Sequence, residues 1–178
     1  MGDFFFGLTE WLRTTFLLET AFWIETTGLN RLLVENFWAV PIAQVLHILG
    51  IAAGFAASLM LTLRVNDLAG GARTVPQVSE RYIPWIWWSL IWIVVSGFLM
   101  LWAEPVRNMI NGVFWTKMIL VLLTIAITIG FQNTARAQAH AAGPTWRASG
   151  GMRATSWIIV ILWCLVMAGG RWIAYAPV

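Results

Sequence analysis

The residues of this chain best suited to chemistry are three ionisable side chains inside long apolar stretches. His47 lies in the first stretch with Gln44 one helical turn earlier, and Lys117 and Arg171 lie in the third and fourth stretches. An ionisable group in a membrane needs a partner or a cavity, so each of these residues is a candidate site. Histidine nitrogen binds haem iron and other metals and hydrogen-bonds quinones, which makes His47 the candidate cofactor or metal ligand.

A b-type haem is the cofactor that would use this set of side chains most fully. His47 would ligate the iron, and the cations Lys117 and Arg171 would pair with the propionates. Met100 and Met167 are thioethers inside apolar stretches that can serve as a second axial ligand. Five-coordinate iron, or a pair of His47 rings across a homo-oligomer, also fits.

Each candidate residue also has a plain structural interpretation. His47 can hydrogen-bond a backbone carbonyl, or Gln44 on the same helix face. Lys117 and Arg171 can extend their stems to the lipid headgroups, or pair with Glu104 at the end of the second apolar stretch. The second histidine of the chain, in a loop on the opposite side of the membrane, disfavours a two-haem electron pathway.

Tryptophans repeat at helical spacing in the second apolar stretch. Trp85, Trp88 and Trp92 fall on one face of a helix, and Trp87 falls on another. Such a stripe usually packs or lies at the membrane surface, because the indole ring is apolar and its N–H favours water. Trp88 and Trp92 can also flank a flat cofactor, so both belong with the candidate cofactor-binding residues.

Composition identifies the solvent around most of the surface as lipid. Of 178 residues, 60% are hydrophobic and only 11% are charged, whereas a soluble domain carries about a quarter charged residues. A net charge of +3 is too small for a nucleic-acid-binding surface. No phosphate-binding loop, catalytic triad or paired zinc-ligand motif occurs in the sequence, which favours a protein without its own catalysis.

Four apolar stretches predict an all-α integral membrane four-helix bundle over residues 37–178. A membrane-spanning helix needs about 20 apolar residues, and the predicted spans are residues 37–63, 83–103, 111–131 and 155–176. Pro84 and Pro105 are expected to bracket the second span, because proline favours helix starts and follows helix ends.

Positive charge in the loops predicts the orientation in a bacterial inner membrane. Arginine stays on the cytoplasmic side during insertion, and loops 64–82 and 132–154 each carry three arginines. Both loops are therefore expected in the cytoplasm, and both termini in the periplasm. The six residues are Arg64, Arg73, Arg81, Arg136, Arg147 and Arg153.

The first 36 residues predict an amphipathic helix rather than a span. Polar residues recur roughly every turn, and Phe4, Leu8 and Trp11 fall near one helical face. Such a helix lies in the membrane interface with its apolar face in lipid. A helix packed on a partner subunit would present the same stripe, so both interpretations stay open.

Three short motifs occur in order on three of the predicted spans. They are Gln44-Val45-Leu46-His47-Ile48-Leu49-Gly50, Phe114-Trp115-Thr116-Lys117-Met118 and Gly170-Arg171-Trp172-Ile173-Ala174-Tyr175. From about Asn36 to Tyr175 the chain resembles an uncharacterised family of small bacterial four-helix membrane proteins, a domain of unknown function. It is more distantly similar to the copper-resistance D membrane proteins.

The resemblance implies that His47, Lys117 and Arg171 are marks of that family, and it implies no activity. It also implies a histidine at the inner end of the third span, where this chain reads Phe131-Gln132-Asn133. A haem held by two histidines of one chain is therefore disfavoured by the resemblance.

Three functions remain as expectations. The first is a small membrane subunit that anchors or stabilises a larger membrane complex, such as a respiratory or photosynthetic one, with other membrane subunits or further copies of this chain as partners. The second is an electron-transfer protein that binds one b-type haem or a quinone in the outer half of the bundle. The third is a metal or small-solute transporter, although few metal-binding side chains lie within the spans.

Overall fold

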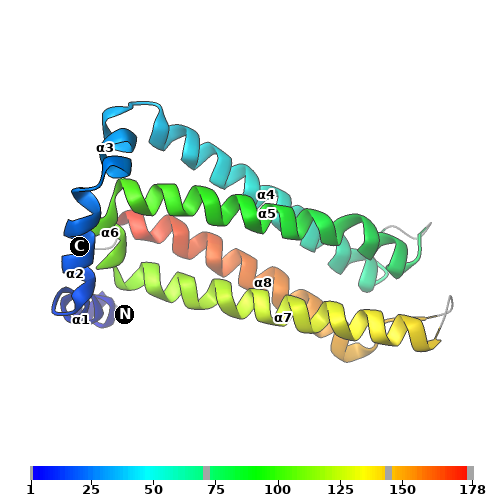
Figure 1. Cartoon of the computed structure of the whole chain (residues 1–178). Helices are drawn as coiled ribbons and strands as arrows, with labels where there is room; N and C mark the ends of the chain where they lie inside the picture. Colours follow the sequence, from blue (N-terminus) through cyan, green and yellow to red (C-terminus); the bar gives the residue numbers. More distant parts are fainter. Residues whose placement is uncertain (1, 70–72, 143–145, 176–178) are drawn as a thin grey trace.

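The computed structural model describes residues 2–69, 73–142 and 146–175. These residues form eight α-helices and one short 3-10 helix and include no strand, so the predicted all-α fold class is confirmed. In chain order the elements are α1 (Gly2–Arg13), α2 (Phe16–Glu25), α3 (Gly28–Glu35), α4 (Ala39–Val65), α5 (Val75–Ala103), α6 (Pro105–Met109), α7 (Gly112–Ala142), α8 (Gly150–Trp172) and η2 (Ile173–Tyr175) (Figure 1).

Four of these helices, α4, α5, α7 and α8, are long and apolar enough to cross a membrane. The chain is therefore a multi-pass membrane protein with the four predicted spans. Because the number of spans is even, the described chain begins and ends at the same end of the bundle, as Figure 1 shows. The last turns of α4 and α7 and the first turns of α5 and α8 lie at the opposite end.

The ends of the helices differ from the predicted spans. Helix α5 begins at Val75 rather than at residue 83, because Thr74 and Gln77 form a capping box ahead of it. Pro84 consequently lies inside the helix instead of at its start. Helix α7 continues to Ala142, beyond the predicted end at residue 131. Ala176, the predicted end of the fourth span, lies outside the described residues.

The spans form two antiparallel pairs. Helix α4 packs along α5, α7 packs on α8, and α4 also contacts α8, which joins the two pairs (Figure 1). Small residues allow this approach, as at other membrane helix interfaces. A Cβ atom on Gly54 would overlap Ser89 Oγ and lie 3.0 Å from Trp163 Cη2, while one on Gly50 would lie 3.1 Å from Ile93 Cγ1.

Helices α1, α2 and α3, here called the end cap, lie across one end of the bundle (Figure 1). The sequence predicted one amphipathic helix in this segment, but the structure divides it into three. Thr15 and Thr27 interrupt the helix because each threonine caps a new one: Thr15 Oγ1 accepts a hydrogen bond from Leu17 N, and Thr27 Oγ1 accepts one from Asn30 N.

Specific hydrogen bonds hold the end cap on the spans. The Nδ2 atom of the buried Asn30 donates to the carbonyl oxygen of Trp102 at 2.8 Å, and Trp102 Nε1 donates to Thr27 Oγ1 at 3.0 Å. Thr9 Oγ1 accepts from the backbone N–H of Gly112 at the start of α7. The end cap is therefore part of the folded protein.

Asn111 organises the turn between α6 and α7. It is completely buried, and its Oδ1 accepts hydrogen bonds from Val113 N at 2.9 Å and Phe114 N at 3.3 Å. Its Nδ2 donates to the carbonyl oxygen of Ile173 in η2 at 3.5 Å. One side chain thus caps the third span and contacts the end of the fourth.

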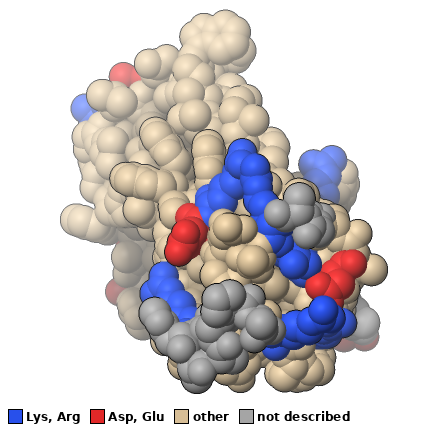
Figure 2. Space-filling view, turned by 90° about the vertical axis from the view of Figure 1, so that its right-hand side faces the viewer, with Lys and Arg blue, Asp and Glu red and all other residues tan. Residues whose placement is uncertain are grey.

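Arginine side chains gather at the other end of the bundle, which Figure 2 shows end-on. At this end Asp67 joins two spans, because its carboxylate forms ion pairs with Arg64 of α4, at 2.9 Å, and with Arg153 of α8. Asp67 has a positive φ of 58° and closes α4 in a Schellman motif, in which Leu68 N donates to the carbonyl oxygen of Leu63.

The hydrogen bond from Arg64 lowers the pKa of the Asp67 carboxyl from its ordinary value, and Arg153 adds to this effect. Any stability from this carboxylate is therefore present above its unfolded pKa and is lost as the pH falls through the lower folded pKa. The Asp67 side chain is half exposed, so its ion pairs add little stability, and its main contribution is to fix the end of α4 against the start of α8.

Candidate functional site

His47 lies on α4 and contacts the neighbouring helix α5. Its Nδ1 lies 2.9 Å from Ser96 Oγ, and the Ser96 hydroxyl donates its own hydrogen to the carbonyl oxygen of Trp92. Since Ser96 has one hydrogen to give, it accepts at the His47 side, and His47 Nδ1 must carry the proton. We infer from this network that His47 Nε2 carries a free lone pair.

The His47 ring fits against α5 because residue 97 is glycine. A Cβ atom on Gly97 would lie 3.2 Å from His47 Cε1, which is closer than side chains normally pack. The partner of the histidine is thus Ser96 rather than Gln44, whose side chain is exposed on α4. Sequence reasoning missed Ser96, although the adjacent Ser96 and Gly97 in an uncharged apolar helix were a signal for a close polar contact.

Lys117 lies on α7 and packs along α8. Its Cβ and Cδ atoms approach the backbone of Gly169 and Gly170, and its Nζ lies 5.1 Å from the centroid of the Phe114 ring. Such a cation–π contact accommodates an ammonium group away from bulk water. His47 lies in the first half of α4 and Lys117 lies in the second turn of α7, and both helices begin at the end-cap end of the bundle (Figure 1).

Arg171 lies at the same end of the bundle, next to Gly170, but its side chain interacts with Tyr175. It is exposed near the end of α8, where its Nη2 donates to Tyr175 Oη at 2.9 Å and its guanidinium lies over the Tyr175 ring. Glu104 pairs with Arg107 at 2.9 Å, rather than with either predicted partner. The cations Lys117 and Arg171 therefore contact different aromatic rings, those of Phe114 and Tyr175.

The tryptophan stripe of α5 faces outward. The side chains of Trp88 and Trp92 are 63% and 52% exposed, and that of Trp85 is similarly exposed. Trp87 turns inward, and its Nε1 donates to Gln132 Oε1 on α7 at 3.2 Å. The outward indoles are exposed on the outer surface of α5, whereas the inward one joins two spans.

The remaining candidate ligands do not belong to a recognisable metal centre in the described part of the chain. Met100 and Met167 are half-buried on α5 and α8. Within the described ranges, no group of three or more His, Cys, Asp or Glu side chains could hold a metal ion. The side chain of His140 lies outside the described residues.

No protein-family model, curated protein or solved structure matches this chain. The resemblance to small bacterial four-helix membrane proteins therefore stays a prediction that rests on the three motifs.

Proposed function

We propose that this chain is a small membrane subunit that anchors or stabilises a larger membrane complex and performs no catalysis itself. The outer face of the end cap carries the proposal. Phe16 is 74% exposed and Trp23 is 61% exposed on α2, and Trp11 on α1 is exposed to the same degree as Trp23. Large apolar side chains that a chain leaves uncovered in one region mark a contact with a partner or with lipid.

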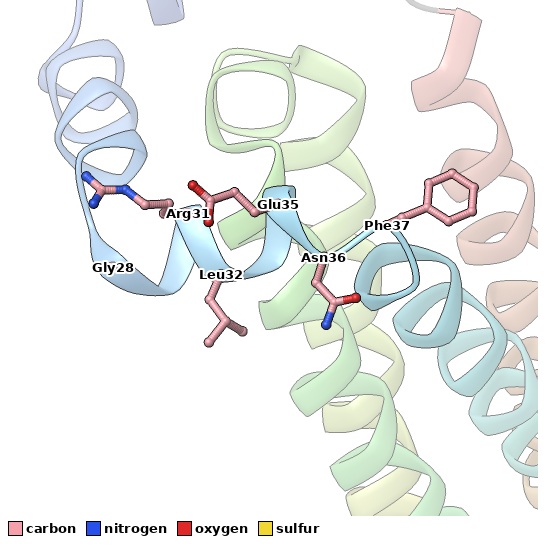
Figure 3. Close-up of a pocket in the computed structure, with 6 residues that line it drawn as sticks. All are labelled: Gly28, Arg31, Leu32, Glu35, Asn36 and Phe37. Carbon is pink, nitrogen blue, oxygen red and sulfur yellow. The ribbon is translucent and has the colours of Figure 1, made fainter.

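A depression beside this face supports a protein partner. It has a volume of about 490 Å³, lies at the turn from α3 to α4 and is open to the outside. Figure 3 shows Arg31 and Glu35 pointing to one side of α3, and Leu32 and Asn36 pointing to the other. A surface that presents both apolar and charged groups is typical of protein interfaces, whereas acyl chains offer no partner for the charged groups.

The charge distribution supports an orientation for this contact. Arginines gather at the loop end of the bundle (Figure 2), and positively charged loops stay in the cytoplasm. In a bacterial inner membrane the end cap would then face the periplasm, together with both chain termini. We therefore place the proposed partner contact at the periplasmic surface of the membrane.

The double substitution Phe16→Ser and Trp23→Ser tests this proposal. We expect recovery of stoichiometric partner chains, purified gently from native membranes, to fall about tenfold or more, because exposed aromatic anchors dominate interface energies. Glu19→Ser, on the same face of α2, is the matched control and should retain the partner. Equal recovery with the double variant, or a parent chain that purifies alone, would contradict the proposal.

The second candidate function is electron transfer with one b-type haem or a quinone, and the His47 network favours it. A histidine that ligates a metal through Nε2 usually donates its Nδ1 hydrogen to a neighbouring acceptor, and in the tautomer inferred above His47 would donate to Ser96 in this way. His47 would hold the iron or accept a quinol hydrogen, and Lys117 would pair with a propionate. A bound haem would supply one-electron chemistry.

His47→Ala tests this second candidate. We expect the variant to lose all bound haem while still inserting, because the substitution removes the iron ligand and leaves the apolar span intact. The measurement is the dithionite-reduced minus oxidised absorption spectrum per mole of purified chain, with Gln44→Ala as the control that keeps the spectrum. Haem retained by His47→Ala, or a colourless parent protein, would refute the haem assignment.

A further inference from the structure

A small polar cavity lies inside the bundle, in the half nearer the arginine-rich end. Its volume is about 10 Å³, and all four spans line it. Helix α4 contributes Ser58 and Thr62, α7 contributes Thr128 and Gln132, and α8 contributes Ser156. A polar cavity at this depth is notable because the interior of a membrane bundle has no bulk water to satisfy polar groups.

Two polar atoms at this cavity have no hydrogen-bond partner among the residues that the structure describes. They are Ser58 Oγ and Gln132 Nε2, in side chains that are only 3% and 5% exposed. The orientation of the Gln132 amide is fixed, because its Oε1 accepts from Trp87 Nε1. The amide therefore offers an N–H donor as its unpartnered group. Buried polar groups without a partner are rare, because each has lost its hydrogen bonds to water.

The other hydroxyl groups of the cavity complete a set of donors and acceptors. Thr128 Oγ1 donates to the carbonyl oxygen of Thr124, and Thr62 Oγ1 donates to the carbonyl oxygen of Ser156. Their hydrogens are used, so each oxygen can only accept a further hydrogen bond. The cavity thus offers two donors, from Ser58 and Gln132, and two acceptors, from Thr62 and Thr128.

We propose that this cavity, which all four spans line, is a binding site for one water molecule that joins α4 to α7 by hydrogen bonds. A volume of about 10 Å³ is the space that a single water needs, and it is far too small for a quinone or haem. Water matches the two donors and two acceptors of the walls. A metal cation does not, because the N–H groups of Gln132 would face it.

Magnetisation transfer from water to the side-chain amide of Gln132 tests the site. In protein labelled with ¹⁵N-glutamine and held in deuterated lipid nanodiscs, a cross-peak between these amide protons and water is expected. Ser58→Val replaces the hydroxyl with methyl groups that fill the cavity, so the cross-peak should disappear. Ser89→Ala should keep it, because Ser89 bonds Ile86 O within its own helix. A parent protein without the cross-peak overturns the proposal.

Thermal unfolding of Ser58→Ala gives a second test, because the two alternatives predict opposite changes in melting temperature. With water bound, the substitution removes a satisfied hydrogen bond, and the melting temperature should fall by about 2–4 °C. In an empty cavity the same substitution would remove an unpartnered hydroxyl, and the melting temperature would stay equal or rise. An equal or higher melting temperature therefore overturns the proposal.

Discussion

Gly54→Ala is expected to lower the free energy of unfolding by about 1–3 kcal/mol, because the added methyl group overpacks the most crowded helix contact. The new Cβ would overlap Ser89 Oγ of α5 and lie 3.0 Å from Trp163 Cη2 of α8. The serine is fixed by its own bond to the carbonyl oxygen of Ile86, and Trp163 is buried. Neither neighbour can move aside without loss of packing.

Gly130→Ala is the matched control for this substitution. A Cβ on Gly130 of α7 would meet nothing within 4 Å, and alanine favours the helix more than glycine does. We expect this variant to be as stable as the parent or slightly more stable. Melting temperatures of both variants in the same nanodiscs make the comparison, and equal values for the two variants would show that the Gly54 contact is not tight.

Asn111→Ala is expected to destabilise the protein by about 1–3 kcal/mol, because it leaves buried backbone donors without an acceptor. The Oδ1 atom that Val113 N and Phe114 N now use would be absent. Water cannot replace it, since residue 111 is completely buried. The contact with Ile173 would be lost as well. Thermal unfolding and the rate of proteolysis near the α6–α7 turn are the measurements.

Two further variants test whether the effect of Asn111→Ala comes from loss of the hydrogen bonds that cap the start of α7. Asn111→Ser retains a capping oxygen and should recover part of the lost stability. Asn133→Ala removes the same amide from an exposed position on α7 and should have no effect. If Asn111→Ala and Asn133→Ala have the same melting temperature, the first turn of α7 does not depend on this cap.

The four spans were predictable because each apolar stretch is long enough to cross a bilayer. Their ends were less predictable, since helices continue into polar sequence wherever local caps allow it. With the capping box of Thr74 and Gln77 ahead of it, α5 begins at Val75, eight residues before the predicted start. In the first 36 residues the helical spacing of apolar residues was recognisable. The sequence did not distinguish the two threonines that cap new helices, Thr15 and Thr27, from other polar residues of an amphipathic helix.

The candidate site was predictable only for its ionisable members. His47 and Lys117 stand out because charge in an apolar stretch is costly, and both lie toward the end-cap end of the bundle. Ser96, Ser58 and Gln132 do not stand out, because single hydroxyl and amide groups are common in membrane helices. Their significance depends on which helix faces meet, and the periodicity of one helix does not specify its partner.

The contact between α4 and α8 has a consequence for how the protein is made. The first span to leave the ribosome forms part of its packing surface with the last one, through Gly54 against Trp163 and through Asp67 against Arg153. Helices α4 and α5 can associate as an early hairpin, but the hydroxyl-bearing face of α4 stays open until α8 has entered the membrane. Completion of synthesis, rather than insertion of the first spans, is therefore the event that closes the bundle and hides this face from membrane proteases.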